Sequence, residues 1–125
     1  MKNIKKFTID FNTWGKQALL TTDGKMCCLG FYSKARGVSN DDMRYVGSWS
    51  DLNLENNFLC QNQESTKIEK QLINVNDSKH LSVPFKIKTI TKLFKENDIH
   101  VNWQNVPKEK LKFLTRAFRK QHIVT

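Results

Sequence analysis

Alternating apolar and polar positions mark two segments of the chain as strands. From Phe7 to Asn12 every second residue is apolar, and the same holds from Ile99 to Gln104. This period of two is typical of a strand that buries one face and exposes the other. The pattern therefore predicts two strands, each with its apolar residues in the core.

The segment from residue 18 to residue 37 allows two structures. Asp23-Gly24 suits the left-handed turn of a β-hairpin between residues 18–22 and 25–28. The same dipeptide could instead lead into a helix that begins after Met26 and ends at Arg36, with Gly37 as its C-terminal cap. We favour the helix, because basic residues then lie in its last turn. Gly30 would mark a place where a neighbouring segment approaches the backbone closely.

Capping residues predict two further helices in the middle of the chain. Ser39 can cap a short helix whose first turn holds two aspartates. Thr66 and Glu69 match a capping box, which predicts a helix over about 67–75. The step Asn76-Asp77-Ser78 then ends that helix in a turn. Between the two, residues 47–63 carry apolar residues without a period, which indicates an irregular segment held by those residues.

The C-terminal third is expected to contain two amphipathic helices. After Pro84, apolar residues fall on one helical face, namely Ile87, Ile90, Leu93 and Phe94. Pro107 suits the first turn of a second helix, whose apolar stripe comprises Leu111, Leu114 and Phe118. With two or three short strands and about four helices, the fold class is α+β, and residues 1–125 are expected to form a single domain.

Length and composition agree with one small globular domain. The chain has 125 residues and a mass of 14.6 kDa, with 38% hydrophobic and 26% charged residues. No apolar run approaches the ~18–20 residues of a membrane-spanning helix, and residues 7–12 are not the core of a signal peptide. We therefore expect no membrane partner and a location in the cytoplasm.

The net charge of +9 is concentrated near the C-terminus. Six basic residues and one acidic residue lie between 107 and 125, whereas seven acidic residues outnumber four basic ones between 37 and 83. On a helical wheel, five C-terminal cations share one arc: Lys108, Lys112, Arg116, Arg119 and Lys120. Such an arc can neutralise several phosphates, and a guanidinium can bind one phosphate with two hydrogen bonds. We predict that this arc binds anions, although a solvated helix face shows the same pattern; Phe113 is the one aromatic residue that borders it.

Three cysteines give a second, catalytic interpretation. Cys27, Cys28 and Cys60 are too few for a disulfide framework and have no metal-ligand spacing, so we expect buried thiols and no metal. A thiolate at a helix N-terminus is stabilised, however, which keeps a cysteine-dependent enzyme using Cys27 or Cys28 as the alternative. Its base would be one of three histidines: His80, His100 or His122. Asp77 could orient the His80 ring. No glycine-rich phosphate loop is present, and no cofactor is expected.

The run Lys25-Met26-Cys27-Cys28-Leu29-Gly30-Phe31 resembles a family of small, largely uncharacterised bacteriophage and prophage proteins with a Cys-Cys-Leu-Gly core motif. The resemblance covers most of the chain. It includes the segments Phe7–Asp10 with the following Trp14, Ala18–Leu20, Asp23–Lys25, Val75–Asp77 and Ile99–Val101. The basic residues from Lys108 onward are less typical of the family. The resemblance implies a phage origin and brings no established activity.

By analogy of origin, the resemblance implies a phage accessory protein that acts in host takeover or against host defences, in the host cell cytoplasm, and we expect it to be non-enzymatic. Its partner would be anionic: a nucleic acid, a nucleotide or an acidic surface of a host protein, bound through the basic C-terminal helix. A third hypothesis, beside the cysteine-dependent enzyme, is a protein–protein inhibitor that uses an apolar patch around Trp49 or Trp103.

Overall fold

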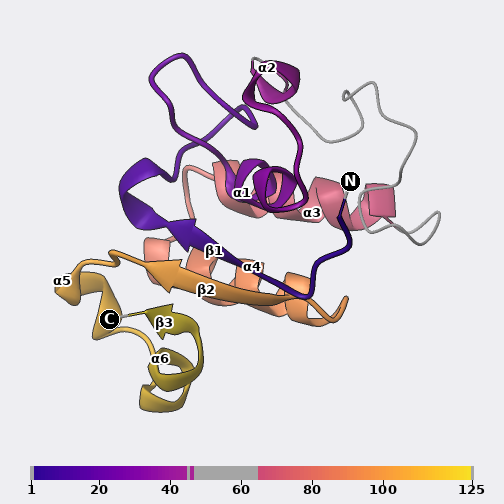
Figure 1. The fold of residues 1–125 in the computed structure, drawn as a ribbon. Coiled ribbons are helices and arrows are strands. Elements are labelled where there is room, and N and C mark those ends of the chain that lie inside the picture. The colour runs from indigo at the N-terminus through magenta and orange to yellow at the C-terminus, as the bar shows by residue number, and fades with distance from the viewer. Residues whose placement is uncertain (1, 45, 47–64, 125) are drawn as a thin grey trace.

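The computed structural model describes residues 2–44, 46 and 65–124, and shows a mixed fold of helices and parallel strands. Figure 1 labels the α-helices and the strands along the chain. In order they are β1 (Lys6–Asp10), the 3-10 helix η1 (Phe11–Thr13), α1 (Cys28–Ala35), α2 (Asn40–Met43), α3 (Ser65–Asp77), α4 (Val83–Lys95), β2 (His100–Gln104), α5 (Lys108–Leu111), α6 (Arg116–His122) and β3 (Ile123–Val124). The predicted α+β class is confirmed.

The three strands form one sheet in the order β1-β2-β3, and both pairings are parallel. Phe7 lies opposite Val101, and Ile9 lies opposite Trp103. All four side chains are buried, because alternation along each strand and this register place them on the same face. Both strands predicted from alternation are therefore confirmed, although Phe11 already belongs to η1.

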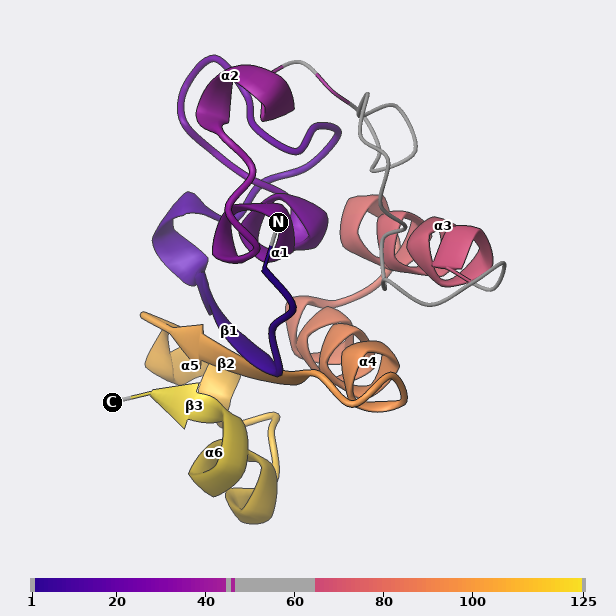
Figure 2. The same cartoon turned by 45° about the vertical axis from the view of Figure 1, so that its right-hand side comes forward.

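The buried face of the sheet is covered by α1 and α4, and α3 packs against both helices (Figure 2). The Phe7 ring meets Tyr32 of α1 and Phe94 of α4 edge-on, with centroids 5.6 and 4.9 Å apart. The Trp103 indole N–H donates to the Thr91 hydroxyl of α4 at 2.8 Å. These contacts fix α1 and α4 on the sheet, so that the loops at the carboxyl ends of the strands lie beside the start of α4.

The favoured helix after Met26 is confirmed, and so is the close approach at Gly30. A Cβ at position 30 would collide with the carbonyl oxygen of Leu19 and lie 2.8 Å from the Met26 Cβ. Helix α1 ends before Gly37, whose φ of +97° is the left-handed conformation of a C-terminal cap. The predicted cap at Ser39 is also present, because its hydroxyl accepts a hydrogen bond from the Asp42 amide at 3.2 Å.

Two predictions about α3 are wrong. The helix already includes Ser65 and Thr66, so Thr66 is not its N-terminal cap. At the other end, Asn76 and Asp77 continue the helix instead of forming a turn. Tertiary hydrogen bonds to the Asn76 side chain, described below, outweigh the local preference of asparagine for turns. The predicted irregular segment 47–63, with Trp49 and Cys60, lies outside the described residues.

The single basic helix predicted after Pro107 is also wrong, because the chain forms α5 and α6 with a break at residues 112–115. Thr115 causes the break: its hydroxyl accepts a hydrogen bond from the Phe118 amide at 3.1 Å and caps α6. Leu114 is buried within the break. In the described part of the chain, each helix is too short or too polar to cross a membrane.

Candidate anion-binding site

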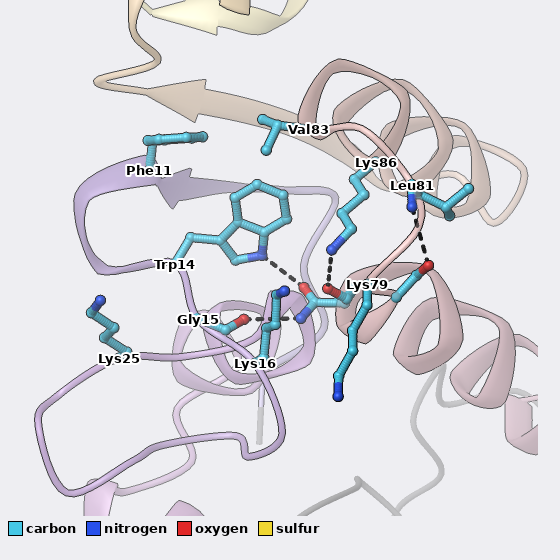
Figure 3. Close-up of a pocket in the computed structure, with 11 residues that line it drawn as sticks. Phe11, Trp14, Gly15, Lys16, Lys25, Lys79, Leu81, Val83 and Lys86 are labelled. Carbon is cyan, nitrogen blue, oxygen red and sulfur yellow. Dashed lines mark hydrogen bonds between the residues drawn. The ribbon is translucent and has the colours of Figure 1, made fainter.

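A pocket of about 460 Å³ lies beyond the carboxyl end of β1 (Figure 3). The loop after β1, the end of α3 and the first turn of α4 form its walls. Four lysines line it: Lys16, Lys25, Lys79 and Lys86. Phe11 and Trp14 add an aromatic wall. This volume is in the range of small-molecule sites, and the carboxyl ends of parallel strands are where such sites commonly lie.

The side chain of Asn76 connects the segments that surround the pocket. It is 1% exposed. Its Oδ1 accepts hydrogen bonds from the Trp14 indole N–H at 2.7 Å and from the Cys28 amide at 3.0 Å. Its Nδ2 donates to the Gly15 carbonyl at 2.9 Å and to the Asp77 carboxylate at 3.0 Å. One buried amide therefore joins α3 to α1 and to the loop after β1.

Lys86 is the buried lysine of the pocket, with only 4% of its surface exposed. Its ammonium donates a hydrogen bond to the Asn76 carbonyl oxygen at 3.0 Å, and so caps the last turn of α3. Burial lowers the pKa of Lys86, the positive charge of Lys16 lowers that pKa further, and the charge of Asp77 opposes the shift. The ammonium groups of Lys16 and Lys86 are thus near enough for their charges to interact.

The other three lysines of the pocket are exposed. Figure 3 shows the side chains of Lys16 and Lys86 extending toward each other beside the Trp14 indole, whereas the ammonium end of Lys79 points away. The described residues that line the pocket include no carboxylate. The nearby Asp77 carboxylate already accepts bonds from Asn76 and from the Gln17 amide at 3.1 Å. The charged side chains that line the pocket are therefore all positive.

The structure does not place the five predicted anion-binding residues on one helical face. Lys108 lies on α5, Lys112 lies in the break, and Arg116, Arg119 and Lys120 lie on α6. All five are exposed. Lys112 lies beside Phe113, with its ammonium 5.2 Å from the centroid of that ring. We call residues 108–120 the C-terminal basic segment.

The residues of the catalytic alternative are not arranged as a thiolate site. Cys27 and Cys28 are buried, and burial raises the pKa of Cys27 to about 11 and also raises that of Cys28. Asp77 accepts hydrogen bonds from Asn76 and Gln17 rather than from the predicted partner His80. Among the described residues, no group of three histidine, cysteine or acidic side chains could hold a metal ion.

The other two histidines, His100 and His122, contact each other on the side of the sheet away from α3 and α4. The rings of His100 and His122 stack with centroids 4.5 Å apart. The Nδ1 of His122 lies 2.9 Å from the Val101 carbonyl oxygen and hydrogen-bonds to it. Burial is the main cause of the lowered pKa of His122. These rings therefore hold α6 against β2.

The four lysines of the pocket were missed by sequence analysis because they are scattered from position 16 to position 86. One signal was available. Lys86 lies four residues before Ile90, which places it on the apolar face of the predicted helix instead of with the solvated lysines. A lysine on an apolar stripe needs a hydrogen-bond partner for its ammonium, and for Lys86 that partner is the Asn76 carbonyl oxygen.

Comparisons of the chain with protein-family models, with curated proteins and with solved structures gave no match. The resemblance to phage proteins with a Cys-Cys-Leu-Gly motif therefore stays a prediction.

Proposed function

We propose that this protein is a non-catalytic binding protein for a phosphate-bearing ligand, and that the pocket lined by Lys16, Lys25, Lys79 and Lys86 is its binding site. The observation that carries the proposal is the pairing of Lys16 with the buried Lys86. Two like charges at the wall of one pocket repel each other. An anion bound between them is attracted by both, and this attraction offsets the repulsion.

The Lys86 ammonium is well suited to bind an oxyanion. It carries three N–H donors, and the Asn76 carbonyl accepts from one of them. The side chain is held by packing along its length, so little conformational entropy is lost when a ligand binds. Lys16, Lys25 and Lys79 are exposed and can move toward the ligand. A fixed cation surrounded by adaptable ones is favourable for phosphate recognition.

The shape of the site supports a small ligand over a flat protein surface. A pocket of about 460 Å³ encloses more of a nucleotide-sized molecule than of a partner's broad surface. Phe11 and Trp14 offer apolar area to the part of the ligand that carries no charge. Among the predicted anionic partners, these features favour a nucleotide.

Calorimetric titration with inorganic pyrophosphate and with ADP tests this proposal. Lys16→Gln should weaken binding of both ligands at least tenfold, because it removes one of the two paired charges. Lys67→Gln is the matched control: it removes the same charge from an exposed position near the start of α3 and should change affinity less than twofold. Equal losses in both variants, or no binding of either ligand at about 1 mM, would refute the proposal.

We also propose that the protein acts in a phage-infected host cell, where the ligand would be a phosphorylated host molecule. This second proposal rests on the Cys-Cys-Leu-Gly resemblance at Cys27–Gly30. Comparing the phosphorylated molecules retained by the wild-type protein and by Lys16→Gln from an extract of bacterial cells would test it. A host nucleotide retained by the wild type alone is the expected result, and equal retention of every compound would contradict it.

A further inference from the structure

A second hollow, of about 450 Å³, lies between the start of α4 and the region of α5. Phe85 and Lys88 of α4 line one side, and Lys110 and Phe113 line the other. Its two phenylalanines are unusually accessible, with exposed fractions of 47% for Phe85 and 62% for Phe113. We call this hollow the aromatic groove.

The exposure of these two rings is not explained by the packing of the fold. Large apolar side chains are normally buried, and exposed ones that gather in one place commonly mark a binding surface. Within the described residues, three large hydrophobic side chains are exposed, and two of them line this one groove. The groove therefore has the features of a surface that is covered when a ligand is bound.

The charges around the groove favour an anionic ligand. Lys88 and Lys110 line it, and the Lys112 ammonium lies 5.2 Å from the Phe113 ring centroid. The described residues that line the groove include no carboxylate. Exposed aromatic rings and lysines that line the same groove match the alternation of base and phosphate along a nucleic acid strand.

We propose that the aromatic groove binds single-stranded nucleic acid, with bases stacked on Phe85 and Phe113 and phosphates bound by Lys88, Lys110 and Lys112. Base-paired duplex does not fit, because its bases already stack on one another and cannot pack against the rings. An acidic protein surface would use the lysines but would gain little from two exposed flat rings. Arg116, Arg119 and Lys120 add positive potential on the adjoining α6.

The aromatic groove and the lysine pocket adjoin each other at the first turn of α4. Val83 lines both, with Lys86 on the pocket side and Phe85 on the groove side. A nucleic acid strand bound in the groove could therefore place its next phosphate in the lysine pocket. This part of the inference rests on the proposed function. The phosphate-bearing ligand of the pocket would then be one end of the strand.

Fluorescence anisotropy with a labelled twelve-residue oligothymidylate tests the groove. The double variant Phe85→Ala/Phe113→Ala should bind the strand at least tenfold more weakly, since stacking contributes roughly 5- to 100-fold per base. Its affinity for inorganic polyphosphate, which has no bases, should change less than twofold. Phe85→Tyr/Phe113→Tyr keeps both rings and should restore binding of the strand. Both positions are exposed, so the melting temperature should stay the same.

Three outcomes would overturn the groove proposal: no binding of the strand at about 50 mM salt, equal binding by the double alanine variant, or equal losses for the strand and for polyphosphate. A pyrophosphate titration separates this proposal from the proposed function. Pyrophosphate binding that is lost in Lys16→Gln but kept in the double alanine variant would support the pocket whatever the groove does. If Lys16→Gln leaves strand binding unchanged, the continuation of the strand into the pocket is refuted.

Discussion

The lysine pocket and the C-terminal basic segment carry similar positive charge but differ in how the fold holds it. The pocket takes its lysines from two distant parts of the chain, residues 16–25 and 79–86, and fixes one of them, Lys86, against the buried Asn76. The C-terminal basic segment has its cations close together in sequence, on two short helices and the break between them, and all of them except the half-buried Lys110 are exposed. Its charges are dense, and Lys110 lines the aromatic groove, but none of its cations lines the lysine pocket.

The difference shows that charge density along a sequence and charge arrangement in a fold are separate properties. Exposed lysines that can move contribute long-range attraction, which salt screens. A lysine held in a pocket gives a fixed hydrogen-bond geometry and a cost of burial that a bound anion can offset. We therefore expect the pocket to determine which ligand binds and the C-terminal basic segment to increase the rate at which anionic ligands arrive.

The largest effect is expected from removal of the Asn76 side chain, which links the segments around the pocket. Asn76→Ala leaves the Trp14 indole N–H and the Cys28 amide without their acceptor. Each buried unsatisfied donor costs about 1–3 kcal/mol, so the free energy of unfolding should fall by roughly 3 kcal/mol or more. Urea denaturation measures this loss.

Arg116→Ala in the C-terminal basic segment is the control for that experiment. This side chain is exposed, so its removal should change the free energy of unfolding by no more than about 0.5 kcal/mol. Similar losses for Asn76→Ala and Arg116→Ala would show that the Asn76 side chain does not organise the pocket.

The pH dependence of sulfate binding tests the role of Lys86. Because the pKa of Lys86 is lowered from the ordinary value of 10.5, mainly by burial, Lys86 loses its proton at a lower pH than an ordinary lysine. Sulfate keeps its charge above neutral pH, so its affinity should fall as the pH rises from neutral toward the ordinary lysine pKa of 10.5. Lys86→Gln should bind sulfate weakly and with no such fall. Identical pH profiles for the two proteins would contradict the role given to Lys86.

The smallest effect is expected at His122, where α6 packs against β2. The folded protein lowers the pKa of His122 below 6.5, mainly through burial, with His100 and Lys95 adding to the shift. The unfolded chain therefore takes up a proton more readily, and stability falls as the pH drops below about 6.5. The melting temperature should decrease from pH 7 to pH 5, and His122→Gln should reduce that decrease. A decrease of equal size in the variant would assign the effect to other groups.

The elements with a regular pattern could be predicted from the sequence, and those decided by tertiary hydrogen bonds could not. Alternation at Phe7–Asn12 and at Ile99–Gln104 identified two strands, because one face of each is buried. Asn76 was placed in a turn, since nothing in its neighbourhood shows that Trp14 and Cys28, about 50–60 positions away, donate to its side chain. The apolar pattern predicts that Thr115 lies inside a helix, whereas in the fold its hydroxyl accepts a hydrogen bond from the Phe118 amide and caps α6.

The same limit applies to the candidate site. Sequence analysis selected cations that are neighbours on a helical wheel, whereas the pocket collects lysines that only the fold brings together. Of the groove residues, only Phe113 and Lys112 were considered in advance. Phe85 and Lys88 lie on the preceding helix, and their place beside α5 depends on the connection through β2.

The central claim is that the lysine pocket, and not the C-terminal basic segment, determines the binding of a small phosphate-bearing ligand. Its most direct test compares two double variants that each lose two positive charges, Lys16→Gln/Lys79→Gln and Arg116→Gln/Arg119→Gln, by calorimetric titration with inorganic pyrophosphate. Their net charges are equal, so long-range attraction falls equally in both. The account predicts at least a tenfold loss of affinity in the pocket variant and less than a threefold loss in the C-terminal variant. The reverse order, or equal losses, would contradict it.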